Sequence, residues 1–146
     1  MKTLTYLILL LSFSSAFAGK IQVGQTVYGN NNDLDLVGTV NAIYGEKAEV
    51  LWTLRNGVPY DFGRVYYWPC ESLSESVHCY KGLCNEDLVY GDNGNELIGK
   101  VTNIFANGTI EIKWMKLNGS NYDFGFLSYW QRDQVTKKVS SCKTCH

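Results

Sequence analysis

The chain has 146 residues, 13 Lys and Arg side chains against 14 Asp and Glu side chains, and a formal net charge of −1. This near balance of charge argues against a protein that binds nucleic acid, because phosphate-backbone binding depends on a dense basic patch. The length suits two small domains rather than one large enzyme fold.

The first 18 residues have the pattern of an export signal. Lys2 supplies a positive start, residues 5–13 form a short apolar stretch, and Ala16 to Ala18 form a small-x-small cleavage site before Gly19. The apolar stretch is shorter than the roughly 20 residues that a membrane span needs. We therefore predict a signal peptide at residues 1–18 and a mature chain, without a membrane span, that is secreted or periplasmic.

The mature chain carries nearly the same sequence twice. Most motifs return after an offset of 62 residues: Val27-Tyr28-Gly29 as Val89-Tyr90-Gly91, Trp52 as Trp114, Tyr60-Asp61-Phe62-Gly63 as Tyr122-Asp123-Phe124-Gly125, and Tyr67-Trp68 as Tyr129-Trp130. A period of this size is a whole small domain and is too long for a solenoid repeat. We predict a first repeat at residues 19–79, a linker at 80–84, and a second repeat with a cysteine-containing tail at 85–146.

No catalytic constellation accompanies the duplication. Asp61 and Asp123 recur, but no second acid or base recurs with them. An Asp at such a position more often accepts hydrogen bonds from its own turn. We therefore do not expect an enzyme, and we predict no catalytic residues.

Both repeats show the patterns of strands and tight turns. Apolar side chains alternate with an outward Glu49 or Glu111 in residues 48–52 and 110–114, which is the period of a half-buried strand. Gly38 and Gly99 within strands indicate bulges or sharp bends. Asn-Gly pairs at 56–57, 107–108 and 118–119 indicate hairpin turns. Five short strands per repeat predict an all-β protein of two small closed barrels that share no sheet, without long helices.

The order of these motifs resembles SH3-like barrels, in particular the MIB/HERC2 type. The resemblance rests on Gly-x-x-Val-Tyr, then Gly-(Thr/Lys)-Val-x-x-Ile, then Val/Ile-x-Trp, then Asn-Gly and Tyr-Asp-Phe-Gly, once in each copy. It implies two tandem SH3-like repeats and non-catalytic recognition of peptides or, in exported bacterial versions, of cell-wall material. The chain lacks the acidic loop and the Trp-Trp pair of peptide-binding SH3 domains.

A run of aromatic residues supplies the candidate ligand-binding residues. Neighbours in a strand point to opposite faces, so a small barrel cannot bury every ring of such a run. The outward rings either pack between the two barrels or form a ligand groove. The candidates are Tyr66, Tyr67, Trp68, Phe126, Tyr129 and Trp130. Trp52 and Trp114, by contrast, are in phase with the apolar face and are predicted in the cores.

Five cysteines in an exported chain indicate disulfides. Local pairs Cys79–Cys84 and Cys142–Cys145, with Cys70 left over, are the first choice, and pairing of Cys70 with Cys79 or Cys84 is the alternative. A zinc site would use the same two pairs beside His78 and His146. The sequence Cys142-Lys143-Thr144-Cys145-His146 also matches the c-type haem attachment pattern.

The preferred hypothesis is an exported, non-catalytic binding module without a cofactor or metal. Its partner would be a peptide, a protein or a cell-wall glycan, recognised through aromatic surface patches. The alternative is a redox or metal protein, with zinc or c-type haem at the terminal cysteines. The sequence does not predict an oligomeric state.

Overall fold

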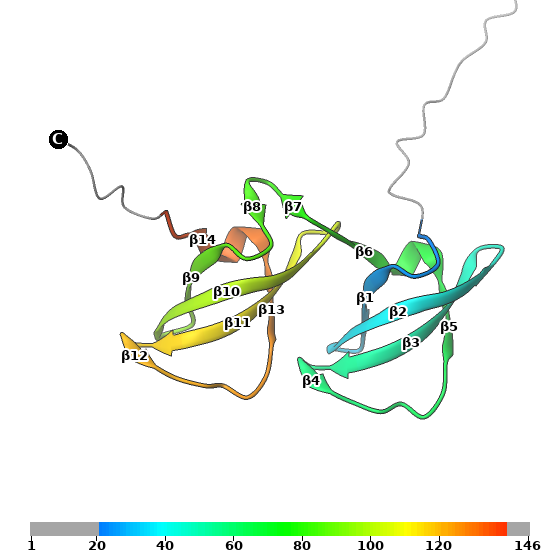
Figure 1. The fold of residues 1–146 in the computed structure, drawn as a ribbon, viewed down its shortest axis with the longest axis horizontal. Helices are drawn as coiled ribbons and strands as arrows, with labels where there is room; N and C mark the ends of the chain where they lie inside the picture. Colours follow the sequence, from blue (N-terminus) through cyan, green and yellow to red (C-terminus); the bar gives the residue numbers. More distant parts are fainter. Residues whose placement is uncertain (1–20, 140–146) are drawn as a thin grey trace, which may run out of the picture.

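The computed structural model describes residues 21–139, and this part of the chain is all-β, with antiparallel strands and no α-helix (Figure 1). The predicted signal peptide and the terminal cysteines Cys142 and Cys145 lie outside the described residues. No helix within residues 21–139 is long and apolar enough to cross a membrane.

The strands fall into two sets that follow one another along the chain. The first set is β1 (Thr26–Asn31), β2 (Leu34–Tyr44), β3 (Lys47–Arg55), β4 (Val58–Pro59), β5 (Tyr66–Pro69) and β6 (Ser74–Val77), with the 3₁₀ turn η1 (Cys70–Ser72) before β6. The hairpin β7 (Cys79–Tyr80) and β8 (Leu83–Cys84) follows. The second set is β9 (Leu88–Asp92), β10 (Glu96–Phe105), β11 (Thr109–Leu117), β12 (Ser120–Asn121), β13 (Ser128–Gln131) and β14 (Thr136–Lys137), with η2 (Arg132–Gln134) before β14.

The two sets pair in the same order. In the first half the order is β5-β3-β2-β1-β6, and in the second half it is β13-β11-β10-β9-β14. The short β4 and β12 add to β3 and β11 in equivalent places. The expectation of matching strand order is confirmed. Within residues 21–139 the first and last strands of each order do not pair, so the sheets curl without closing into the predicted barrels.

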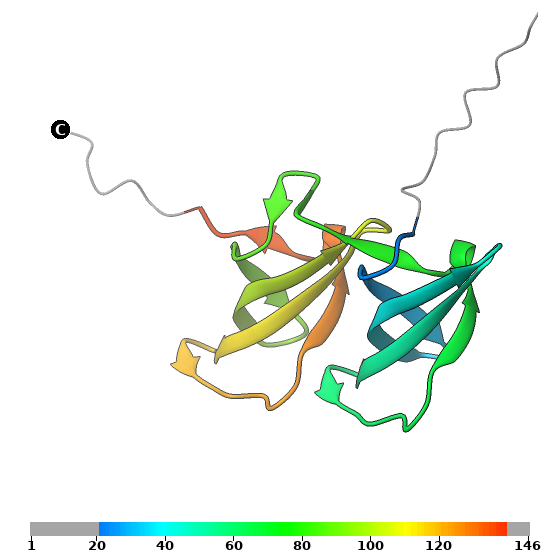
Figure 2. The ribbon, with the colours of Figure 1, turned by 45° about the vertical axis from the view of Figure 1, so that its right-hand side comes forward.

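The halves are also joined by strand pairing, so the prediction that they share no sheet is wrong. β6 pairs with β1 through Ser74 and Glu75, and then with β10 of the second half through Ser76 and Val77. Figures 1 and 2 show β6 running from one half to the other above the space between them. The physical reason is that β6 is longer than its counterpart β14, and its last two residues, Ser76 and Val77, pair with the second sheet.

Local backbone signals in the sequence are realised at the expected places. Asn56 and Gly57 have φ of 48° and 76°, as a two-residue hairpin turn requires, and Asn118 and Gly119 have φ of 48° and 83°. The pairing register shifts at Gly38 and, in the second half, at Gly99. A Cβ at Gly99 would lie 2.6 Å from the Trp114 ring, so this bulge position must be glycine.

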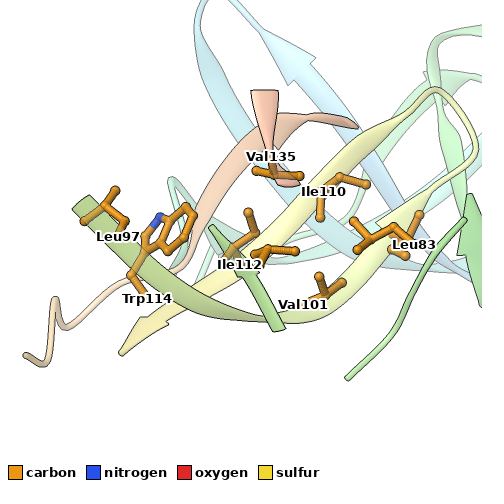
Figure 3. Packing of buried hydrophobic residues seen from close by; sticks show 9 residues of the cluster. Leu83, Leu97, Val101, Ile110, Ile112, Trp114 and Val135 are labelled. Atoms are coloured by element: carbon orange, nitrogen blue, oxygen red, sulfur yellow. The ribbon is translucent and has the colours of Figure 1, made fainter. Parts of the chain in front are cut away.

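Each half has its own hydrophobic core around one buried tryptophan. The first core includes Val27, Val50 and Trp52, and the second core, drawn in Figure 3, includes Val101, Ile112 and Trp114. Both tryptophans therefore lie where the strand alternation placed them. Burying a Val, Ile or Leu side chain contributes about 1.5–3 kcal/mol, and these cores hold several such residues.

A third cluster lies between the halves. Tyr28 and Val37 of the first half pack against Phe105 of the second, with Leu54 and Tyr129 at the margin. The Tyr28 ring lies 5.3 Å from the Phe105 ring and 5.8 Å from the Tyr129 ring. The halves are thus docked through side chains as well as through β6.

Candidate binding surface

The long loop between β4 and β5, together with the first residue of β5, carries a cluster of three aromatic rings, the first-loop cluster Tyr60, Phe62 and Tyr66. The Phe62 ring lies edge-on to the Tyr60 ring at 4.6 Å and to the Tyr66 ring at 5.9 Å. Phe62 and Tyr66 also pack against the first core, which anchors the loop. Tyr60 remains 45% exposed, so an amphipathic ring is presented at the surface.

The loop between β12 and β13 carries an equivalent cluster, the second-loop cluster Tyr122, Phe124 and Phe126. The Phe124 ring lies edge-on to the Tyr122 ring at 4.6 Å and to the Phe126 ring at 6.0 Å. Tyr122 and Phe126 are 50% and 47% exposed. The third ring comes from a different position in each copy, since Phe126 aligns with Arg64 and Tyr66 aligns with Ser128. Two rings of each cluster thus come from the repeated Tyr-Asp-Phe-Gly motif, and only the third ring comes from a different position.

Both loops lie at the same edge of the molecule. Figures 1 and 2 show the two loops side by side at the lower edge in both views. The second loop touches the β3–β4 turn of the first half, where the Leu127 amide donates to the Gly57 carbonyl oxygen at 3.0 Å. The two loops are therefore neighbours, and we call the region that carries their two clusters the aromatic edge.

The two clusters differ in charge. The Arg55 guanidinium lies 5.1 Å above the Tyr60 ring, and the Arg64 guanidinium lies 4.8 Å above the Tyr66 ring. In the second half the aligned residues are Leu117 and Phe126, so no arginine accompanies those rings. The first-loop cluster can pair with a carboxylate or phosphate through its arginines, while the second-loop cluster offers uncharged rings.

The six ligand-binding residues predicted from the sequence fall in four different places. Trp68 and Trp130 lie half-buried against Trp52 and Trp114, with ring distances of 5.0 and 5.1 Å. Tyr66 and Phe126 belong to the two loop clusters. Tyr129 lies half-buried between the halves, and Tyr67 is 59% exposed on the outer face of the first half. The aromatic run thus contains both packed residues, such as Trp68 and Tyr129, and an exposed residue, Tyr67.

Sequence reasoning missed four rings of the aromatic edge, namely Tyr60, Phe62, Tyr122 and Phe124. The repeated Tyr-Asp-Phe-Gly motif could have indicated these four rings, because it places a Tyr and a Phe on either side of one Asp. That Asp has the structural role expected of it: the Gly63 amide donates to Asp61 Oδ1 at 2.8 Å, and the Gly125 amide donates to Asp123 Oδ1 at 2.9 Å. The Asp fixes the loop so that the flanking rings meet.

A carboxylate is buried at the junction of the halves, where the sequence predicted an outward side chain. Glu111 is 5% exposed, and it accepts hydrogen bonds from the Tyr129 hydroxyl at 2.9 Å and the Thr102 hydroxyl at 2.8 Å. Burial raises the pKa of Glu111. Burial, and then the Glu111 charge, also raise the pKa of Tyr129. The outward prediction for Glu111 is wrong because the first half docks on the face of the second half that carries Glu111 and Tyr129.

The cysteines show one disulfide within the described residues, Cys79–Cys84, which closes the β7–β8 hairpin. This pair is confirmed, and the alternative pairings of Cys70 with either residue are excluded. Cys70 has no disulfide partner within residues 21–139. A disulfide removes Cys79 and Cys84 as thiolate ligands, and residues 21–139 contain no cluster of His, Cys, Asp and Glu that could hold a metal. Cys142, Cys145 and His146 lie outside the described residues.

Comparison with known proteins found no matching family model, no similar curated protein and no similar solved structure. The disulfide and the finding on membrane-spanning helices are compatible with a secreted or periplasmic protein.

Proposed function

We propose that this chain is an exported, non-catalytic binding module, built from two tandem SH3-like repeats, that holds a peptide, protein or cell-wall glycan along the aromatic edge. The proposal rests on one observation: the two loops present equivalent clusters of partly exposed rings on the same edge, although the third ring of each cluster comes from a different position in the repeat. The matching strand order of the two halves and the bulged second strand support the repeat architecture.

The chemistry of the edge indicates the kind of ligand. Tyr and Phe faces bind sugars and extended peptides at a low cost in conformational entropy because the rings have few rotatable bonds. Arg55 and Arg64 add two guanidinium groups next to the first-loop cluster. A linear ligand can contact both clusters at once if it has a carboxylate for the arginines of the first-loop cluster and, further along, an apolar group or sugar ring for the second-loop cluster. Binding along one edge of the two halves would give the avidity of two linked sites.

The test uses the mature chain with Tyr60→Ala and Tyr122→Ala as separate variants. Both side chains are about half exposed and each loses one edge-on ring contact, so the substitutions should cost about 1 kcal/mol, well below the unfolding free energy of a domain. Retention on insoluble peptidoglycan, on a glycan array and on immobilised envelope proteins distinguishes the three ligand classes. We expect both variants to lose retention on the same probe, and Val23→Ala, an exposed apolar change outside the loops, to keep it.

A charge variant separates the role of the arginines from that of the rings. Arg64→Gln keeps a polar side chain but removes the guanidinium above Tyr66. We expect weaker retention, most strongly at low salt, where charge contacts are least screened. If every loop variant is retained as well as the unmodified chain on every probe that captures it, the aromatic edge is not a binding surface.

A further inference from the structure

The contact between the halves uses two different faces, one from each half. The first half contributes Tyr28, Val37 and Leu54, which lie side by side on β1, β2 and β3; we call this the donor face. The second half contributes Phe105, Tyr129 and Glu111 from β10, β13 and β11; we call this the acceptor face. Because the two faces differ, the contact is heterologous. If each half carries both kinds of face, such a contact leaves one donor face and one acceptor face of the chain unoccupied.

The duplication places a second acceptor face on the first half. Tyr44, Tyr67 and Glu49 align with Phe105, Tyr129 and Glu111. Glu49 pairs with Tyr67 across the strands as Glu111 pairs with Tyr129. The Tyr67 hydroxyl donates to Glu49 Oε2 at 3.1 Å, and the Tyr44 ring lies 6.2 Å from the Tyr67 ring. This face is preformed, yet Tyr44 and Tyr67 are 61% and 59% exposed, whereas Phe105 is 0% exposed.

A second donor face lies on the second half. Tyr90, Ile98 and Lys116 align with Tyr28, Val37 and Leu54, and they are paired across β9, β10 and β11 in the same register. Tyr90 is 37% exposed, whereas Tyr28 is 8% exposed. In Figure 1, β1 and β9 lie on the left of their halves and β5 and β13 on the right, so the open faces are at opposite ends of the molecule.

The strand pairing of the backbone is equivalent in the two halves, as the side-chain faces are. β14 pairs with β9 as β6 pairs with β1, at the aligned residues. β6 then continues to pair Val77 with Ile104 of the second half. The residue aligned with Val77 is Val139, which is 81% exposed, and the residue aligned with Ile104 is Ile43. Within residues 21–139 the pairing of β2 with β1 ends at Thr39, so the strand edge beside Ile43 is open.

The two open faces carry opposite charges. Lys116 replaces Leu54 on the open donor face, and the Lys138 ammonium lies 5.6 Å above the Tyr90 ring. The open acceptor face has the Glu49 carboxylate beside its tyrosines. The contact within the chain has no such pair, because Leu54 is apolar and Glu111 is buried. A contact between chains therefore brings together faces of opposite charge.

We propose that copies of this chain associate head to tail, with the donor face at Tyr90 and Ile98 of one chain seated on the acceptor face at Tyr44 and Tyr67 of the next. Lys138 and Val139 of the first chain then extend along β2 of the second, as the aligned Ser76 and Val77 of β6 extend along β10. The product is an open row of halves in which each junction repeats the junction inside the chain, and the aromatic edges lie in line.

The test blocks one end at a time with exposed substitutions that leave the cores intact. Tyr44→Asp blocks the acceptor end, Tyr90→Asp blocks the donor end, and Val58→Asp is the control for an added charge on another exposed apolar residue. In sedimentation velocity, we expect the unmodified chain and the control to grow in mass with concentration beyond the dimer. Each end-blocked variant alone should stay monomeric, and an equimolar mixture of the two should form a dimer and nothing larger.

Each outcome bears on the proposal. If the unmodified chain remains a monomer up to about 1 mM, the proposal is overturned. At that concentration, even a weak association with a dissociation constant of about 1 mM would include half of the chains. If either end-blocked variant dimerises alone as the unmodified chain does, the contact is not the heterologous one inferred here. The measurement needs no ligand, so its failure is independent of the proposed function.

Discussion

Phe105 and Tyr44 occupy aligned positions in the two halves, and replacing each by alanine gives a matched pair. Phe105 is 0% exposed in the contact between the halves, whereas Tyr44 is 61% exposed. Truncating a fully buried Phe costs about 3–5 kcal/mol of unfolding free energy, because apolar contacts are lost and a cavity remains. Truncating an exposed ring should change the unfolding free energy by no more than about 0.5 kcal/mol.

The expected loss for Phe105→Ala is a large part of the total, since domains unfold with about 5–15 kcal/mol. For a chain of this size it corresponds to a fall in melting temperature of roughly 10–20 °C. Urea unfolding followed by tryptophan fluorescence reports on both halves, because each core contains tryptophans. The measurement is made at a concentration where sedimentation shows only monomer, so that association does not contribute.

The two halves should unfold together, because β6 pairs with strands of both and the third cluster spans them. The result that contradicts this reasoning is an equal effect of the two substitutions. Two well-separated unfolding transitions in the unmodified chain would also show that the halves are not docked as described.

Two further predictions concern the buried carboxylate and the thiols. Because burial raises the pKa of Glu111 in the folded state, the unfolded chain loses this proton first as pH rises, so the stability contributed by the protonated group is present below about pH 4 and is lost as pH rises through the folded-state pKa. The measurement is the unfolding free energy in denaturant titrations of the unmodified chain and of Glu111→Gln. We expect the difference between them, unmodified minus variant, to fall as pH rises through this range. A constant difference would contradict the burial of an ionisable group. For the thiols, titration of the denatured, unreduced chain should find Cys79 and Cys84 blocked and Cys70 reactive, and peptide mapping that finds Cys70 joined to either one would contradict the pairing.

The sequence was sufficient to predict the turns, the bulges and the Cys79–Cys84 disulfide, because interactions between neighbouring residues determine this local structure. The Asn-Gly turns at 56–57 and 118–119 need positive φ at both residues, and glycine at position 38 is needed where the Trp52 ring crosses the strand. The disulfide Cys79–Cys84 followed from two cysteines on either side of a tight turn. Each of these depends on a few neighbouring residues, which the sequence displays directly.

The docking of the halves could not be read from the sequence in the same way. Glu49 and Glu111, like Tyr67 and Tyr129, are identical in the two copies, but Tyr67 is exposed and Glu49 partly exposed, whereas Glu111 is buried and Tyr129 half-buried. Strand alternation distinguishes a core face from an outer face, and it says nothing about whether another domain covers the outer face. The extension of β6 onto β10 decided this, and it depends on the path of the chain between the repeats.

The most direct test of the proposed aromatic edge compares one-loop variants with a two-loop variant on the probe that captures the mature chain. Tyr60→Ala and Tyr122→Ala should each weaken the measured affinity about tenfold, which is about 1.4 kcal/mol and within the range for an aromatic contact residue. The double variant should bind more weakly than either single variant, because the two loops contact the same ligand. An affinity of the double variant equal to that of the unmodified chain would contradict the account.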